Sequence, residues 1–153
     1  MSRCRHPLPG FRATCLTVGG LHVALAGMLL LRGVRPSMAQ FAVPDAILDS
    51  PHYNDAIFWV YSHQIVIGLI LGVLGLRAED GRLKLWMARL LFAAHAYYAY
   101  LDLRASDSPL GTGLYQGPAS LIPAAVGLVM MLLFAHLSLC AATGADDRPA
   151  RPE

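Results

Sequence analysis

Residues 57–76 read IFWVYSHQIVIGLILGVLGL, an unbroken run without Asp, Glu, Lys or Arg. A helix needs about 20 mostly apolar residues to cross the roughly 30 Å hydrocarbon core of a bilayer, so this run is typical of a transmembrane segment. Because backbone groups in lipid must find hydrogen-bond partners within their own segment, we expect the run to be helical. It therefore decides the fold class, and predicts an all-α membrane protein.

Three further segments of the chain are also mostly apolar and are separated by polar stretches. They are Ala13–Leu31, Leu85–Leu101, which is the shortest and contains Arg89, and Ala119–Ala142. Of the 153 residues, 14% are charged and 56% are hydrophobic, whereas about a quarter of the residues of a soluble domain are charged. The sequence thus predicts one bundle of four transmembrane helices over residues 13–142. A basic tail of residues 1–12 precedes it, and a polar tail of residues 143–153, expected to be disordered, follows it.

The lysine and arginine residues outside the spans predict how the chain is oriented. Eight of them lie on the side of the two termini in a four-span chain: Arg3, Arg5, Arg12, Arg77, Arg82, Lys84, Arg148 and Arg151. Three lie on the opposite side: Arg32, Arg35 and Arg104. Since loops rich in positive charge stay in the cytoplasm, we expect both termini there and two polar loops outside, in a protein of the bacterial inner membrane. The net charge of +2 does not indicate a nucleic-acid partner.

A second interpretation treats the N-terminal region as a cleaved signal peptide. It has a basic start, an apolar run and the small-residue sequence Ser37-Met38-Ala39, so the mature chain would begin at Gln40 and keep three spans. The apolar run of residues 13–31 is long for a signal peptide, however, and Arg32 and Arg35 would crowd the cleavage site. An N-terminal mass that begins at Gln40 would decide for cleavage.

Small residues in two of the spans predict where helices pack closely. Gly68, Gly72 and Gly75 fall near one face of the second span, which would let a neighbouring backbone approach. We expect the matching surface on the first span to consist of Gly20, Ala24 and Gly27.

Polar side chains in the second and third spans predict a site in the outer half of the bundle. His63 and His95 each lie six residues inside the outer end of their span, which is about 9 Å at the rise of a helix. Each also ends a stripe of helically spaced residues that begins with an acid at the surface: Asp55, Trp59 and His63, and Asp102, Tyr98 and His95. Because the two helices are antiparallel, the two imidazoles are expected to face one another.

This pair of histidines allows two interpretations. As a functional site, it would ligate haem iron or another metal, hydrogen-bond a quinone or a substrate carbonyl, or relay protons. Alternatively, each histidine hydrogen-bonds a backbone carbonyl or a tyrosine and only fixes the positions of the helices. No haem or other cofactor can be assigned from the sequence.

Two weaker groups of residues complete the candidates. Near the inner face, Cys15, His136 and Cys140 are of the types that bind Zn²⁺ or Cu⁺, but three ligands on two helices without close spacing are a poor metal signal, and ordinary buried side chains explain them better. In the second outer loop, Arg104 and Asp107 are three residues apart and could pair. The chain carries no GxSxG, HExxH or phosphate-binding glycine motif, so the sequence does not indicate an enzyme.

The segment from His95 to Ser120, HAYYAYLDLRASDSPLGTGLYQGPAS, together with the layout of spans and loops across Ala13–Ala142, resembles small four-helix bacterial inner-membrane proteins of the BphX and DoxX type. The resemblance implies an accessory role, in some cases beside oxidoreductases. We therefore expect a non-catalytic membrane protein that assists a membrane partner or another copy of itself, or assists the passage of a small apolar solute. The alternative is a membrane redox component that uses His63 and His95.

Overall fold

The computed structural model describes residues 8–145, and this part of the chain contains helices and no strand. The four long helices are α1 (Phe11–Arg32), α4 (Pro51–Arg77), α5 (Gly81–Ala105) and α6 (Ile122–Ala145). The short ones are α2 (Val34–Met38), η1 (Ala39–Phe41), α3 (Asp45–Leu48) and η2 (Pro118–Leu121). Within the described residues, three helical segments are long and apolar enough to cross a membrane: Phe11–Arg32, Pro51–Arg77 and Pro118–Cys140.

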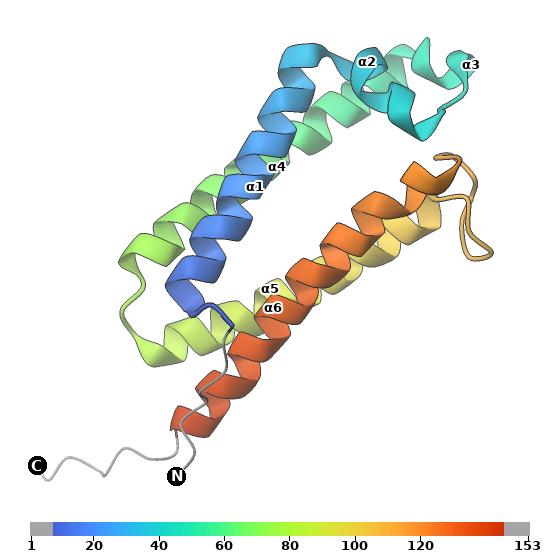
Figure 1. The fold of residues 1–153 in the computed structure, drawn as a ribbon. Helices are drawn as coiled ribbons and strands as arrows, with labels where there is room; N and C mark the ends of the chain where they lie inside the picture. Colours follow the sequence, from blue (N-terminus) through green and yellow to red (C-terminus); the bar gives the residue numbers. More distant parts are fainter. Residues whose placement is uncertain (1–7, 146–153) are drawn as a thin grey trace, which may run out of the picture.

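The long helices form two hairpins that are splayed apart (Figure 1). Helix α1 packs along α4, and α5 packs along α6. The hairpins approach each other at the end where residues 78–80 connect α4 to α5, here called the turn end. They diverge toward the opposite end, here called the loop end, which carries residues 33–50 and 106–117.

Glycines allow α1 and α4 to touch through their backbones. A Cβ atom added at Gly68 would lie 2.6 Å from the carbonyl oxygen of Gly19, and one added at Gly19 would lie 2.7 Å from the carbonyl oxygen of Gly68. A Cβ atom added at Gly75 would also be close, at 3.1 Å from the Cβ atom of Cys15. The prediction that Gly72, Gly20 and Gly27 take part in the close helix contact is wrong, because Cβ atoms added at these three glycines would meet nothing within 4 Å.

Capping residues set where α4 and α5 begin. Ser50 is the N-cap of α4 and Pro51 occupies its first turn, so this helix starts six residues before the predicted span at Ile57. At the start of α5, the Asp80 carboxylate accepts a hydrogen bond of 2.8 Å from the backbone N–H of Leu83. Helix α6 continues to Ala145, so the predicted disordered tail is helical over residues 143–145, and residues 146–153 lie outside the described part.

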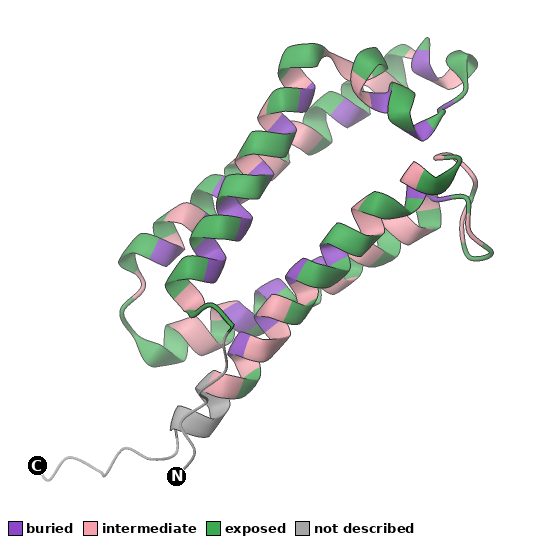
Figure 2. Ribbon diagram, viewed as in Figure 1, coloured by how far each residue is buried: buried purple, intermediate pink, exposed green. Residues whose placement is uncertain are grey.

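An apolar core at the turn end holds the two hairpins together. Side chains from all four long helices are buried there, and Figure 2 shows buried positions facing the space between the hairpins. The members of this turn-end core are Cys15, Val18, Leu71, Ala88, Leu91, Met130, Phe134 and Leu137. Because it fills the space between the hairpins, it closes that space on the side of the turn end.

A second apolar cluster organises the loop end, where the sequence predicted only polar loops. Its buried members are Leu29, Met38, Phe41, Val43, Leu48 and Ile57. The ring of Phe41 lies 5.1 Å from that of Tyr115, and the backbone N–H of Gln116 donates a 2.8 Å hydrogen bond to the carbonyl of Phe41. Burial raises the pKa of Tyr115, so its phenol stays neutral. The two loops therefore join the hairpins a second time.

The surface charges of these loops pair differently from the prediction. Arg104 and Asp107 are both exposed, and the ion pairs found among the described residues join Arg35 to Asp45, at 2.9 Å, and to Asp49. Hydrogen bonds with Asp49 and then Asp45 raise the pKa of Arg35. Because Arg35 forms ion pairs with both aspartates, it links α2 to the first residue of α3 and to the residue that follows its end.

Candidate functional site

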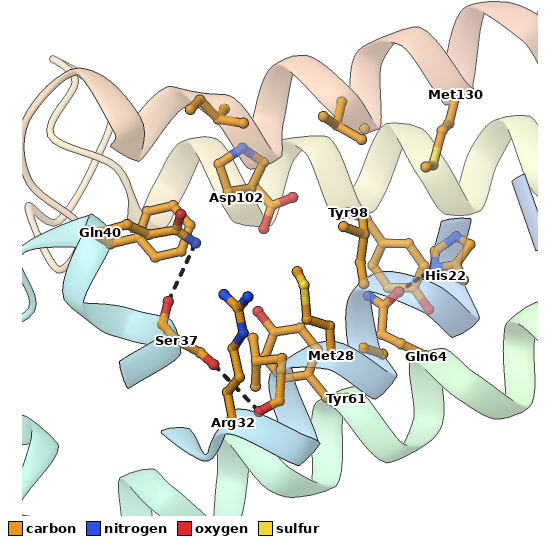
Figure 3. A pocket seen from close by; sticks show the side chains of 18 of the residues that line it. His22, Met28, Arg32, Ser37, Gln40, Tyr61, Gln64, Tyr98, Asp102 and Met130 are labelled. Carbon is orange, nitrogen blue, oxygen red and sulfur yellow. Dashed lines mark hydrogen bonds between the residues drawn. The ribbon is translucent and has the colours of Figure 1, made fainter. Parts of the chain in front are cut away.

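A cavity of about 450 Å³ lies between the two hairpins, on the loop-end side of the turn-end core (Figure 3). All four long helices and the segment from Pro36 to Phe41 line it. Sites for small molecules typically have volumes of about 300–1,000 Å³. The cavity is therefore large enough for a small organic ligand.

The walls of the cavity differ sharply in polarity. Helices α4 and α5 contribute only polar lining residues: Tyr61, Gln64, His95, Tyr98 and Asp102. Helix α6 contributes only apolar ones and a glycine: Ile122, Pro123, Val126, Gly127 and Met130. Helix α1 contributes both kinds, since His22 and Arg32 flank leucines, Ala26 and Met28. The arrangement suits a ligand that has a polar part and an apolar part.

The deep part of the cavity holds a chain of hydrogen-bonding groups from three helices. His22 Nδ1 contacts the side-chain amide of Gln64, and His22 Nε2 lies 3.3 Å from His95 Nε2. His95 Nδ1 donates to the carbonyl of Leu91 over 2.8 Å. His95 also packs against Phe134, with ring centroids 5.2 Å apart. This series of side-chain contacts connects the α1–α4 hairpin with the α5–α6 hairpin.

The hydrogen bonds fix the tautomers of the two imidazoles when both are neutral. Because His95 Nδ1 carries the proton given to Leu91, its Nε2 is an acceptor, and His22 must donate through its own Nε2. His22 Nδ1 then accepts, so the Gln64 amide, whose Oε1 atom faces His22 in the structure, must be turned over to present its NH₂ group. With this set of tautomers and this orientation of the Gln64 amide, every hydrogen bond from Gln64 to Leu91 has one donor and one acceptor, and no buried charge is needed.

Charged and polar side chains surround the mouth of the cavity at the loop end. Arg32 from the end of α1 and Asp102 from α5 both point into it (Figure 3). Beside them, the Ser37 hydroxyl donates to the carbonyl of Leu29 over 3.4 Å, and the Gln40 amide donates to the carbonyl of Ser37 over 3.3 Å. The mouth is thus charged, whereas the deep part is polar and neutral.

One of the two predicted stripes lines the cavity. His95, Tyr98 and Asp102 all face it, as expected for a stripe along the third span. Asp55, Trp59 and His63 are exposed instead. His63 Nδ1 donates to the carbonyl of Trp59 over 2.8 Å and its ring lies 4.0 Å from the indole, so His63 does not face His95.

His22 and Gln64, and not His63, lie beside His95 in the cavity. Gln64 follows His63 directly and therefore points about 100° away from it around the helix. His22 and Gln64 are polar residues inside otherwise apolar spans, and such residues usually face the interior of a membrane protein. That signal could have identified them.

The geometry also bears on metal and haem binding. Two imidazoles on opposite faces of a haem must hold their nitrogens about 4 Å apart with the macrocycle between them, whereas His22 and His95 contact each other directly. Cys140 lies 3.6 Å from His136 Nε2, and Cys15 is buried in the turn-end core. Among the described side chains, no three His, Cys, Asp or Glu converge on one point that could hold a metal ion.

No protein family, curated protein or solved structure compared with this chain matches it. The cavity between the hairpins is the best-defined site in the described residues, because it combines a closed base, a polar wall and charged groups at its mouth.

Proposed function

We propose that the chain is a non-catalytic integral membrane protein with four transmembrane helices, which binds a small, largely apolar molecule in the cavity between its hairpins. Binding of this kind would serve either the passage of the molecule or its delivery to a partner in the membrane. The accessory role implied by the sequence resemblance is of the same kind.

The length of α5 and the distribution of its charges support a fourth span. Its 25 residues correspond to about 37 Å, enough to cross the hydrocarbon core. Arg82 and Lys84 lie at one end and Asp102 and Arg104 near the other. Between them only Arg89 is charged, and its guanidinium lies 5.4 Å from the ring centroid of Trp86, toward the turn end. A charge so close to the end of a span can reach the lipid head groups.

The observation that carries the proposal is the apolar rim on one side of the cavity. Leu25 and Met28 of α1 and Ile122 and Val126 of α6 line the cavity and are also exposed. In a bilayer these side chains would meet lipid tails, so an apolar molecule could enter from the lipid without crossing water. The polar wall behind them would then hold its polar group.

A bulky residue on this rim is expected to block binding. In Val126→Trp, the indole would fill the space between α1 and α6, so uptake of a hydrophobic fluorescent probe by the chain in maltoside micelles should fall about tenfold. Val129→Trp is the matched control, because Val129 is also exposed on α6, at 57% against 38% for Val126, but does not line the cavity. Equal loss in both variants, or none in either, would contradict the proposed entry route.

The proposed topology makes a separate prediction. A reporter that is active only in the cytoplasm should be active when fused after Glu153 and inactive when inserted within residues 106–117. The reason is the excess of lysine and arginine on the side of the termini, eight residues against three. Activity in the opposite pattern would show that the loop end lies in the cytoplasm.

A further inference from the structure

Arg32 and Asp102 present opposite charges to each other across the mouth of the cavity (Figure 3). Both line the cavity, yet the ion pairs found among the described residues are those of Arg35. The two groups therefore face a shared space and are not joined to each other. Arg32 is the last residue of α1, where a positive charge is also favoured by the helix dipole.

The two opposed charges select among ligand head groups. An anion placed between them is attracted by Arg32 and repelled by Asp102, and a cation experiences the reverse, so either gains little net energy. A head group with a negative and a positive end gains from both residues if each end meets its opposite charge. The Ser37 hydroxyl and the Gln40 amide beside Arg32 add neutral hydrogen-bonding groups at the same level.

The shape of the cavity indicates what is attached to the head group. Arg32 follows His22 by ten residues and Asp102 follows His95 by seven, so the mouth lies about 15 Å and about 10 Å along the helices from the two imidazoles. A volume of about 450 Å³ lies in the lower part of the range for small-molecule sites. This space favours one alkyl chain over two, and the apolar wall of α6 offers the surface for it.

We propose that the cavity binds a single-chain zwitterionic amphiphile, with its phosphate or carboxylate against Arg32, its ammonium group against Asp102 and its alkyl chain along α6. This inference rests on the proposed function, because it assumes that an amphiphile enters the cavity from the lipid. It adds the class of head group and the two residues that recognise it. No bond is made or broken in the ligand.

The test compares four probes with the same chain length on the full chain in maltoside micelles, with bound ligand measured by native mass spectrometry. The probes are myristoyl lysophosphatidylethanolamine (zwitterionic), myristoyl lysophosphatidylglycerol (anionic), tetradecyltrimethylammonium (cationic) and tetradecanol (uncharged). The zwitterion should bind at least about tenfold more tightly than either singly charged probe. Equal or tighter binding of the anion or the cation would overturn the proposal.

Charge variants then assign the two ends of the head group. Arg32→Gln should weaken binding of the zwitterionic probe and strengthen binding of the cationic probe. Asp102→Asn should weaken binding of the zwitterionic probe and strengthen binding of the anionic probe. Arg104→Gln and Asp107→Asn are the controls, since both residues are exposed near the mouth but do not line the cavity. The swap of Arg32→Asp with Asp102→Arg should restore binding of the zwitterion, which also guards against single variants that fail to fold.

The outcomes separate this inference from the proposed function. If tetradecanol binds and Val126→Trp abolishes its binding, but the four probes show no preference for the zwitterion, the cavity is a ligand site and the head-group inference is wrong. If no probe binds, tetradecanol included, both proposals fail. An unchanged order of the probes in Arg32→Gln and Asp102→Asn would likewise overturn the assignment of the two charges.

Discussion

Gly68→Ala is expected to lower the free energy of unfolding by about 1–3 kcal/mol, the usual cost of forcing an extra group into a closely packed site. The added methyl group would lie 2.6 Å from the carbonyl oxygen of Gly19 and 2.8 Å from Cγ2 of Val23, so α1 and α4 would have to move apart. Backbone oxygens cannot rotate away as a flexible side chain can. The loss should be measured by thermal unfolding in one detergent, followed by circular dichroism.

Gly72→Ala is the matched control on the same helix. Its added Cβ atom would meet nothing within 4 Å, and alanine favours a helix over glycine by up to about 1 kcal/mol. This variant should therefore be as stable as the parent chain or slightly more stable. If Gly72→Ala were the more damaging of the two, α4 would present a different face to α1, and the cavity between the hairpins would have different walls.

The positions of α1, α4 and α6 could be predicted from the sequence because each contains an apolar run long enough to cross a membrane, whereas α5 contains several charged residues and is less clearly marked by its hydropathy. Each predicted span falls within a helix, the last one within η2 and α6 taken together. A stretch of some twenty apolar residues must form a helix in lipid whatever its neighbours are. The exact ends depend on caps such as Ser50 and Asp80, which lie outside the apolar runs.

The direction in which each helix faces could not be predicted in the same way. A side chain on α4 is apolar whether it meets α1 or lipid, so the sequence carries little contrast between the two faces. This is why the sequence predicts a contact at Gly20 where the structure has one at Gly19, and predicts His63 at the site where His22 and Gln64 lie. The predicted stripe on α5 does face the cavity, because His95, Tyr98 and Asp102 have helical spacing and so lie on one side of the helix.

The loop-end cluster escaped prediction for a different reason. Met38, Phe41 and Val43 lie in a loop segment of mixed polar and apolar residues that has no helical or strand period. Their burial depends on Tyr115 and Leu114, more than seventy residues later in the chain. These segments meet only because the two hairpins pack against each other, and no local sequence pattern predicts that packing.

His95→Leu is expected to destabilise the chain by about 1–3 kcal/mol, because it leaves His22 Nε2 buried without its partner. His22→Leu should cost a similar amount, since it removes the same contact and also the partner of Gln64. The double variant His22→Leu with His95→Leu should lose less than the sum of the two single losses, by about 0.5–3 kcal/mol. Unfolding in one detergent measures all three.

His63→Leu is the control that distinguishes a specific link from a general effect of removing histidine. His63 is exposed and bonds only to its own helix, so its replacement should change stability by no more than about 0.5 kcal/mol. Strictly additive losses at His22 and His95 would mean that the two hairpins are held together by the turn-end core and the loop-end cluster alone. Non-additive losses would instead show that the His22–His95 contact at the floor of the cavity helps to hold the two hairpins together. A ligand that reaches the floor would then contact the residues that fix the separation of the hairpins.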